Sequence, residues 1–147
     1  MNQRVLCTLG QLLHNLTLGN LPLAKRVSRL EEITVHGIHL DSRKVTAGDL
    51  FVALHGSAQH GLSYLDQAIA GGATAVIYDP QGVETTALQA SLQQLAATAT
   101  ITLVAVPNLR QLISRIAGRF YHHPSRQLNL IGVTGTNGKS SVSHFIA

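Results

Sequence analysis

Apolar residues follow two different spacings along the chain, and the two spacings alternate. Continuous apolar runs are typical of strands buried on both faces of a sheet, whereas apolar residues at i, i+3, i+4 and i+7 are typical of one helix face. The runs predict strands over residues 50–54, 73–78, 101–106 and 128–134, and the helical spacing predicts helices over residues 9–16, 63–71, 88–95 and 107–121. Strands that alternate with helices favour an α/β fold with a mostly parallel or mixed sheet, flanked by helices and joined by right-handed crossovers.

Two local patterns add detail to this outline. Residues 33–40 alternate between apolar and polar side chains around Gly37, which predicts a strand or a short hairpin. Ser63, with Asp66 three residues later, forms an acidic version of the capping box. This pair predicts the start of the second helix.

The best candidate for a linker lies at residues 122–126, where His123 precedes Pro124 and a helix is expected to end. We therefore predict a first domain over residues 1–125 and a second over residues 126–147. The second contains a strand, a glycine-rich loop and the start of a helix. No Asp or Glu occurs after Glu84, and no strand follows the last helix. We expect this second domain to be truncated.

Composition and charge narrow the class of protein. Charged residues make up 12% of the chain and the net charge is +4, with Lys and Arg scattered rather than gathered in a stripe. This pattern disfavours nucleic-acid binding and suits a small anionic ligand that carries phosphates. The single cysteine, Cys7, allows no internal disulfide, and no apolar run reaches membrane-spanning length. We expect a cytoplasmic monomer that contacts neither nucleic acid nor membrane.

Residues 132–140 read Gly-Val-Thr-Gly-Thr-Asn-Gly-Lys-Ser and lie between a predicted strand and a predicted helix. This is the setting of a phosphate-binding loop, in which backbone N–H groups and the helix amino end hold the anion. Lys139 would reach the terminal phosphates, and the Ser140 hydroxyl would bind Mg²⁺. The general pattern places its first glycine at Val133, so an ordinary glycine-rich turn with an exposed lysine is the alternative.

Other candidate residues have simpler interpretations. The chain has eight histidines, but the pairs His36–His39 and His122–His123 have no carboxylate or cysteine partner at metal-ligand spacing, so surface or capping roles are favoured. Ser42 could serve only to form a turn. Arg43 and Arg119 could be ordinary solvated charges.

Three motifs together resemble the Mur ligase family. The phosphate loop of that family reads T-G-T-N-G-K-[ST], as residues 134–140 do here. Residues 41–45 with 48–53 resemble the D-S-R-x-V-x-x-G-D-x-F-V-A stretch of its tripeptide-forming member, and residues 118–121 with 124–125 resemble G-R-F-Y-x-x-P-S. The chain has Ser140–Ser141 where the family usually has two threonines, and serine also offers Mg²⁺ a hydroxyl.

The resemblance implies an ATP-dependent ligase of peptidoglycan precursor synthesis. Such an enzyme activates the D-Glu side-chain carboxylate of UDP-N-acetylmuramoyl-L-Ala-D-Glu as an acyl phosphate, which the amine of a diamino acid then attacks. In the family the first of three domains holds the uridine end of the substrate and the second holds ATP. This chain would contain the first domain and the beginning of the second, so it would bind the UDP moiety and be inactive alone.

The resemblance also implies site residues. The ATP and Mg²⁺ site would comprise Gly135, Thr136, Asn137, Gly138, Lys139, Ser140 and Ser141, with Ser140 as the metal ligand and Lys139 as the one residue with a catalytic role. The site for the UDP-linked substrate would comprise Leu40, Ser42, Ser57, Ala58 and Gln59.

Three alternatives stay open. The chain could belong to another Mur-type or a folylpolyglutamate-type ligase, or to a P-loop kinase, although a kinase is expected to place its phosphate loop near the start of the chain. It could also be a nucleotide-sugar binding module without catalysis. The diamino acid is expected to be meso-diaminopimelate rather than lysine, a choice that the family makes with a third domain.

Overall fold

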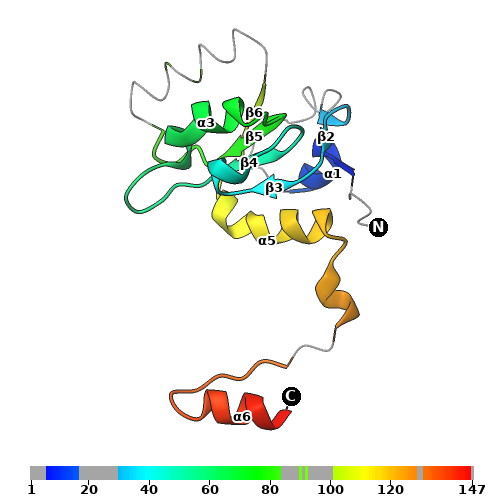
Figure 1. The fold of residues 1–147 in the computed structure, drawn as a ribbon, viewed down its shortest axis with the longest axis vertical. Coiled ribbons are helices and arrows are strands. Elements are labelled where there is room, and N and C mark those ends of the chain that lie inside the picture. Colours follow the sequence, from blue (N-terminus) through cyan, green and yellow to red (C-terminus); the bar gives the residue numbers. More distant parts are fainter. Residues whose placement is uncertain are drawn as a thin grey trace.

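The computed structural model describes residues 6–16, 30–83, 90, 92, 101–128 and 131–146. Figure 1 shows a sheet with helices on its two sides and a C-terminal helix that stands apart from it. The strands are β1 (Cys7–Thr8), β2 (Thr34–Val35), β3 (Ile38–His39), β4 (Leu50–Ala53), β5 (Ala75–Tyr78) and β6 (Thr102–Ala105). The helices are α1 (Leu9–Leu13), α3 (Leu65–Ala70), α5 (Leu109–Phe120) and α6 (Lys139–Ile146), with 3₁₀ turns η2 (Ser42–Lys44), η3 (Gly61–Tyr64) and η4 (Pro124–Gln127).

The main sheet has four parallel strands in the order β3-β4-β5-β6. The predicted α/β fold with a parallel sheet is therefore confirmed, as are the strands expected near residues 50, 75 and 102. All four residues of β4 are buried, as expected for an interior strand that carries apolar side chains on both faces. The predicted helix over residues 88–95 lies outside the described residues, apart from Ala90 and Leu92.

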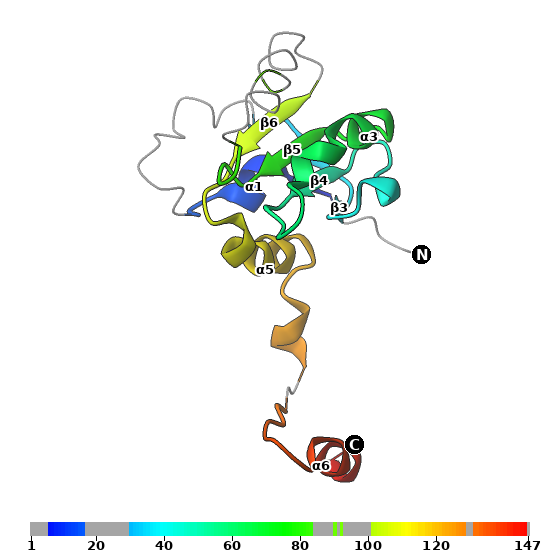
Figure 2. The same ribbon diagram turned by 90° about the vertical axis from the view of Figure 1, so that its left-hand side faces the viewer.

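The two faces of the sheet are covered by different helices. Leu50 and Val52 of β4 belong to a core shared with α1 and α5. Phe51 and Ala53 belong to a second core shared with α3. Because side chains alternate along a strand, one unbroken apolar run supplies both cores. Figure 2 shows α3 and α5 on opposite sides of the strands.

A second, two-stranded sheet pairs β1 with β2 in antiparallel orientation. The predicted strand or hairpin over residues 33–40 is thus two strands that belong to different sheets, because β2 pairs with β1 and β3 pairs with β4. Thr8 ends β1 and caps α1, since its hydroxyl accepts from the Gln11 backbone while the Gln11 side chain accepts from the Thr8 backbone.

The predicted cap at Ser63 is wrong. Ser63 lies inside η3, and α3 begins at Leu65 without a side-chain cap. The buried His60 caps η3 instead: its Nδ1 accepts from the Leu62 backbone N–H at 3.0 Å, and its Nε2 lies 2.9 Å from the Asp79 carbonyl oxygen. A buried imidazole that satisfies two backbone groups thus takes the place of a local serine cap.

The predicted strand over residues 128–134 is not found in its described part, since Leu128 and residues 131–134 have no regular structure, and residues 129 and 130 lie outside the described residues. The side chains of Leu128 and Ile131 are 62% and 67% exposed. An apolar run becomes a strand only where another strand pairs with it, and none of the described residues does so here. Helix α6 begins at Lys139, as predicted, and the predicted domain boundary at residue 125 falls within η4.

Candidate functional site

The residues expected to bind the UDP-linked substrate lie at one edge of the main sheet. Leu40 and Ser42 follow β3, and the segment 57–59 follows β4. Because β3 and β4 are adjacent and parallel, their carboxyl ends meet at this edge. Ligands of open α/β sheets bind outside the carboxyl ends of the strands. The structure therefore brings these two predicted segments to one place.

Ser42 does more than form a turn. It is the first residue of η2 and its side chain is buried, with the hydroxyl donating to Gln67 Oε1 of α3 at 2.6 Å. Asp41 carries out the local capping role, because its carboxylate accepts from the Arg43 backbone N–H. The Ser42 hydroxyl is thus oriented by a residue 25 positions further along the chain.

The segment 57–59 is exposed and is held at both ends. His55 and His60 form an antiparallel bridge that closes the loop. A Cβ atom on Gly56 would lie 2.5 Å from the Gln59 carbonyl oxygen, so the two sides approach too closely for any larger residue. At the tip, Gln59 Oε1 accepts a hydrogen bond of 3.0 Å from the Tyr64 hydroxyl.

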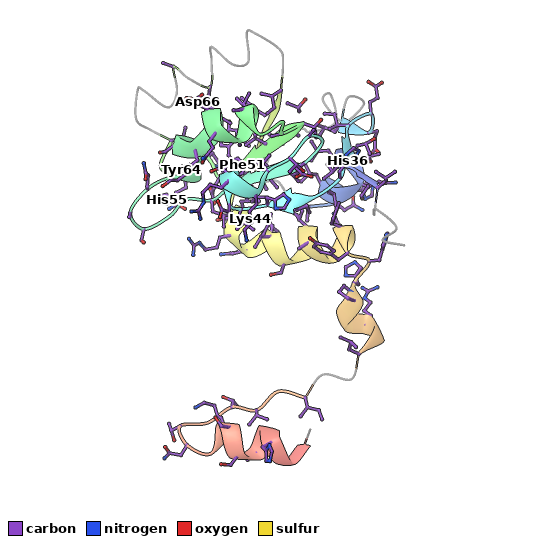
Figure 3. The ribbon with its side chains drawn as sticks, viewed as in Figure 1. His36, Lys44, Phe51, His55, Tyr64 and Asp66 are labelled. Atoms are coloured by element: carbon purple, nitrogen blue, oxygen red, sulfur yellow. The ribbon has the colours of Figure 1, made fainter. Side chains whose placement is uncertain are left out.

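Neighbouring elements anchor this loop to the fold. The Arg110 guanidinium donates to the His55 carbonyl oxygen at 2.9 Å. The buried Asp79 carboxylate accepts from the Gln81 and Leu109 backbone N–H groups, which ties the end of β5 to the start of α5. Figure 3 shows His55 and Tyr64 toward the same end of the molecule.

The two arginines that could have been ordinary solvated charges both have defined partners. Arg43 donates through Nε and Nη2 to the two carboxylate oxygens of Asp41, at 2.9 and 2.8 Å. The Arg43 hydrogen bonds lower the pKa of the Asp41 carboxyl to about 2. Arg119 donates to the carbonyl oxygens of Leu12 and His14 at the end of α1.

The glycine-rich loop is a separate feature. Gly135 and Gly138 have positive φ angles of 143° and 76°, which favour glycine, and α6 begins directly after them. The Lys139 ammonium donates back to the Gly135 carbonyl oxygen. Residues 134–142 are exposed, and Figures 1 and 2 show this segment well away from the sheet. The structure does not bring the two predicted sites together.

The donor set of this loop fits a nucleotide with Mg²⁺. It presents an ammonium at Lys139, hydroxyls at Ser140 and Ser141, and backbone N–H groups at the start of a helix that runs for eight residues. A Cβ atom on Gly138 would have no neighbour within 4 Å, so space remains open beside the loop.

The described residues contain neither a membrane-spanning helix nor a cluster of metal ligands. No helix in that part of the chain is long and apolar enough to cross a membrane. No group of three or more His, Cys, Asp or Glu side chains in the same residues is arranged to hold a metal ion.

Sequence reasoning missed three residues of this edge: His60, Tyr64 and Gln67. Tyr64, the last residue of η3, and Gln67, the third residue of α3, hold the two predicted segments. An exposed aromatic at Tyr64 and an exposed amide at Gln67, three positions apart where a helix is predicted, were the available signal.

The family comparison decides the relationship. The sequence model described as "Mur ligase family, catalytic domain" matches residues 34–121. The chain belongs to the Mur ligase family. The resemblance drawn from the motifs is thereby confirmed, and the matched residues include both segments at the edge of the sheet and end before the glycine-rich loop.

Individual Mur ligases give the scale of the similarity. The UDP-N-acetylmuramoyl-L-alanyl-D-glutamate--2,6-diaminopimelate ligase of Alkalilimnicola ehrlichii is 43% identical over 113 residues, which are 77% of this chain and 22% of that protein. The ligase of the same name from Pseudomonas aeruginosa is 43% identical over 126 residues, 86% of this chain and 23% of that protein. The chain therefore spans less than a quarter of either relative.

A solved structure is also similar. The crystal structure of MurF ligase from Thermotoga maritima in complex with ADP matches with a TM-score of 0.37 and 24% sequence identity, over 54% of this chain and 15% of that chain.

Proposed function

We propose that this chain is the UDP-substrate-binding part, with the beginning of the ATP-binding part, of an ATP-dependent ligase that joins meso-diaminopimelate to UDP-N-acetylmuramoyl-L-Ala-D-Glu. The observation that carries the proposal is the meeting of the Asp41–Ser42–Arg43 segment and the 57–59 loop at the carboxyl edge of β3 and β4, inside the region that matches the Mur ligase family. The two relatives at 43% identity bear the name of this activity.

The edge offers the groups that a uridine nucleotide needs. Ser42 supplies a hydroxyl and Gln59 supplies an amide, and Ser57 and Ala58 are exposed on the same loop as Gln59. The Leu40 side chain is 55% exposed and provides an apolar surface for the flat face of a pyrimidine ring. The exposed Lys44, the last residue of η2, would add positive charge near an anionic diphosphate.

The glycine-rich loop would bind ATP, which supplies the phosphoryl group that activates the acceptor carboxylate. Residues 135–139 would hold the phosphates with backbone N–H groups and the Lys139 ammonium, which would leave its present partner, the Gly135 carbonyl. Ser140 would provide a hydroxyl to Mg²⁺, with Ser141 beside it. No Asp or Glu occurs after Glu84, so we propose that these residues alone do not turn over ATP. We also propose that the ligase acts in the cytoplasm and that it is a monomer.

Isothermal titration calorimetry of the chain with UDP-N-acetylmuramoyl-L-Ala-D-Glu tests the proposal. We expect saturable binding that UDP displaces, and Ser42→Ala should weaken it by about tenfold, the effect of losing one hydrogen bond to a ligand. Ser114→Ala, on the exposed face of α5, is the matched control. Absence of binding by UDP compounds at millimolar concentration would rule out the uridine site. ATP hydrolysis by the isolated chain would contradict the proposed inactivity.

The alternative ligases are separated by substrate. A folylpolyglutamate-type enzyme would bind a folate and not the UDP-linked dipeptide, and a dipeptide-adding relative would bind UDP-N-acetylmuramoyl-L-Ala with at least equal affinity. Titration with these two compounds, on the same chain, distinguishes the three activities.

A further inference from the structure

The junction of η3 and α3 contacts both halves of the proposed uridine site. The Tyr64 hydroxyl donates to Gln59 Oε1 at 3.0 Å, and three residues further on Gln67 Oε1 accepts from the Ser42 hydroxyl at 2.6 Å. Tyr64 is the last residue of η3 and Gln67 is the third residue of α3. This junction therefore contacts both the segment after β3 and the segment after β4.

We propose that Tyr64 and Gln67 are positioning residues that fix the hydrogen-bonding polarity of this site, so that it selects uracil over cytosine. This inference rests on the proposed function, because it requires that a pyrimidine nucleotide meets Ser42 and Gln59.

The argument begins with the single proton of the Ser42 hydroxyl. A separation of 2.6 Å is typical of an O–H···O hydrogen bond and short for N–H···O, which supports the carbonyl oxygen of Gln67 as the partner. Once its proton is donated to Gln67, Ser42 Oγ has only lone pairs left. Toward a ligand it acts solely as an acceptor.

Tyr64 has the opposite effect on Gln59. Its hydroxyl donates to the carbonyl oxygen of the Gln59 amide, which orients the NH₂ group away from Tyr64. An amide NH₂ has two protons to donate and no acceptor capacity. The site therefore presents one acceptor, at Ser42, and a donor group, at Gln59.

This combination matches one pyrimidine and mismatches the other. Uracil carries an N–H at N3 between two carbonyl oxygens, so it offers a donor flanked by acceptors. Cytosine has a lone pair at N3 and an amino group at C4, so both polarities are reversed along that edge. A polar group placed against a partner of the same polarity is left without a hydrogen bond, which is the costly case.

The test is the ratio of the dissociation constants of CDP and UDP, measured by calorimetry on the 147-residue chain. For the unmodified chain we expect UDP to bind at least about tenfold more tightly, the effect of one mismatched hydrogen bond. Gln67→Met removes the acceptor, so the Ser42 hydroxyl can turn and donate to cytosine N3. Tyr64→Phe lets the Gln59 amide turn over. Each variant removes one of the two mismatches with cytosine and should therefore lower the ratio severalfold.

A conservative variant and two controls exclude a merely structural effect. Gln67→Glu keeps an acceptor for Ser42, so the ratio should be retained, and its added charge cancels because CDP and UDP carry the same diphosphate. Tyr121→Phe and Gln111→Met make the same chemical changes at exposed positions of α5 and its end. These two should leave the ratio unchanged, and all variants should unfold near the same temperature.

The outcomes separate this inference from the proposed function. If the unmodified chain binds no UDP compound, both fail. If it binds UDP and CDP equally, or if Gln67→Met and Tyr64→Phe keep the original ratio, the positioning role is wrong and the uridine site stands. If Gln67→Glu loses the ratio as Gln67→Met does, the role of Gln67 as an acceptor for Ser42 is wrong.

Discussion

Several charged residues in this fold form ion pairs or hydrogen bonds that could not be predicted from the sequence. Asp41 and Arg43 are two positions apart and form a forked ion pair at the proposed substrate site. Arg119 reaches across to α1, more than a hundred residues earlier in the chain. The first pair affects the ionisation of a surface group, and the second contact bears on folding stability.

The titration of Asp41 should be displaced to low pH. Its pKa is lowered from 3.8 to about 2, first by the Arg43 side-chain hydrogen bonds. The ion pair is therefore fully present above pH 3.8 and is lost as the pH falls through about 2. Carboxyl ¹³C chemical shifts followed by NMR measure this directly. Arg43→Gln should return the midpoint toward 3.8, and an unchanged midpoint would contradict the assigned cause.

Removal of the Arg119 guanidinium should destabilise the fold. Arg119→Ala leaves the carbonyl oxygens of Leu12 and His14 without this donor, and hydrogen bonds from a charged group contribute about 1.5–3 kcal/mol. We expect the free energy of unfolding, measured with urea, to fall by about that amount. Arg115→Ala, at an exposed position of the same helix, is the control. Equal effects of the two changes would show that the contact to α1 has no special weight.

At the scale of elements, α5 is the helix that closes one face of the sheet. Its buried residues Leu109, Ile116 and Phe120 belong to the core that contains α1 and the alternate side chains of β4 and β5. The same stripe was visible in the sequence because its spacing is helical and the segment lacks Gly and Pro until Gly118.

Ile116 provides the corresponding test. It is fully buried, so Ile116→Ala leaves a cavity and should lower the free energy of unfolding by about 2–5 kcal/mol. Thermal and urea denaturation measure the change. Ser114→Ala, exposed on the same helix, should stay within about 0.5 kcal/mol. A loss below 1 kcal/mol for Ile116→Ala would show that α5 is not packed as described.

Elements were predictable from sequence where local pattern and tertiary packing agree. The apolar runs of β4 and β5 are buried on both faces. Leu40 and Ser42 come after β3 and the 57–59 loop comes after β4, so both lie at the same edge of the sheet. Predictions failed where a distant partner decides the structure. Residues 131–134 belong to an apolar run in the sequence, but no strand among the described residues pairs with them. The cap of η3 comes from the buried His60 and not from Ser63. The Ser42–Gln67 contact could not be predicted, since no local rule joins residues 25 apart.

For the whole molecule, the buried hydrophobic residues extend from Leu9 to Phe120. The glycine-rich loop and the first residues of α6 lie outside this core and are exposed. We propose on this ground that the part of the chain before residue 125 folds as a separate unit, and the predicted domain boundary stays a prediction.

A chain that ends after Gln127 should fold and keep the uridine site. We expect its midpoint of thermal unfolding to lie within a few degrees of the 147-residue chain, because none of the described core residues is removed. Its affinity for UDP, measured by calorimetry, should be unchanged within about twofold, a difference of about 0.4 kcal/mol. Loss of cooperative unfolding would place the boundary elsewhere.

The dipeptide His36–Gly37 separates β2 from β3. It therefore connects the two sheets, because β2 pairs with β1 in one sheet and β3 pairs with β4 in the other. It is fixed on both sides, since His36 N–H donates to the Gly48 carbonyl and the Gly37 carbonyl accepts from Leu50. Slippage of a strand by one residue reverses which of its side chains face inward. Because the connection is this short, a one-residue shift in the register of β2 would also shift β3. Misaligned pairing during folding would then place apolar side chains on the wrong face in both sheets, which disfavours it more than in a single sheet.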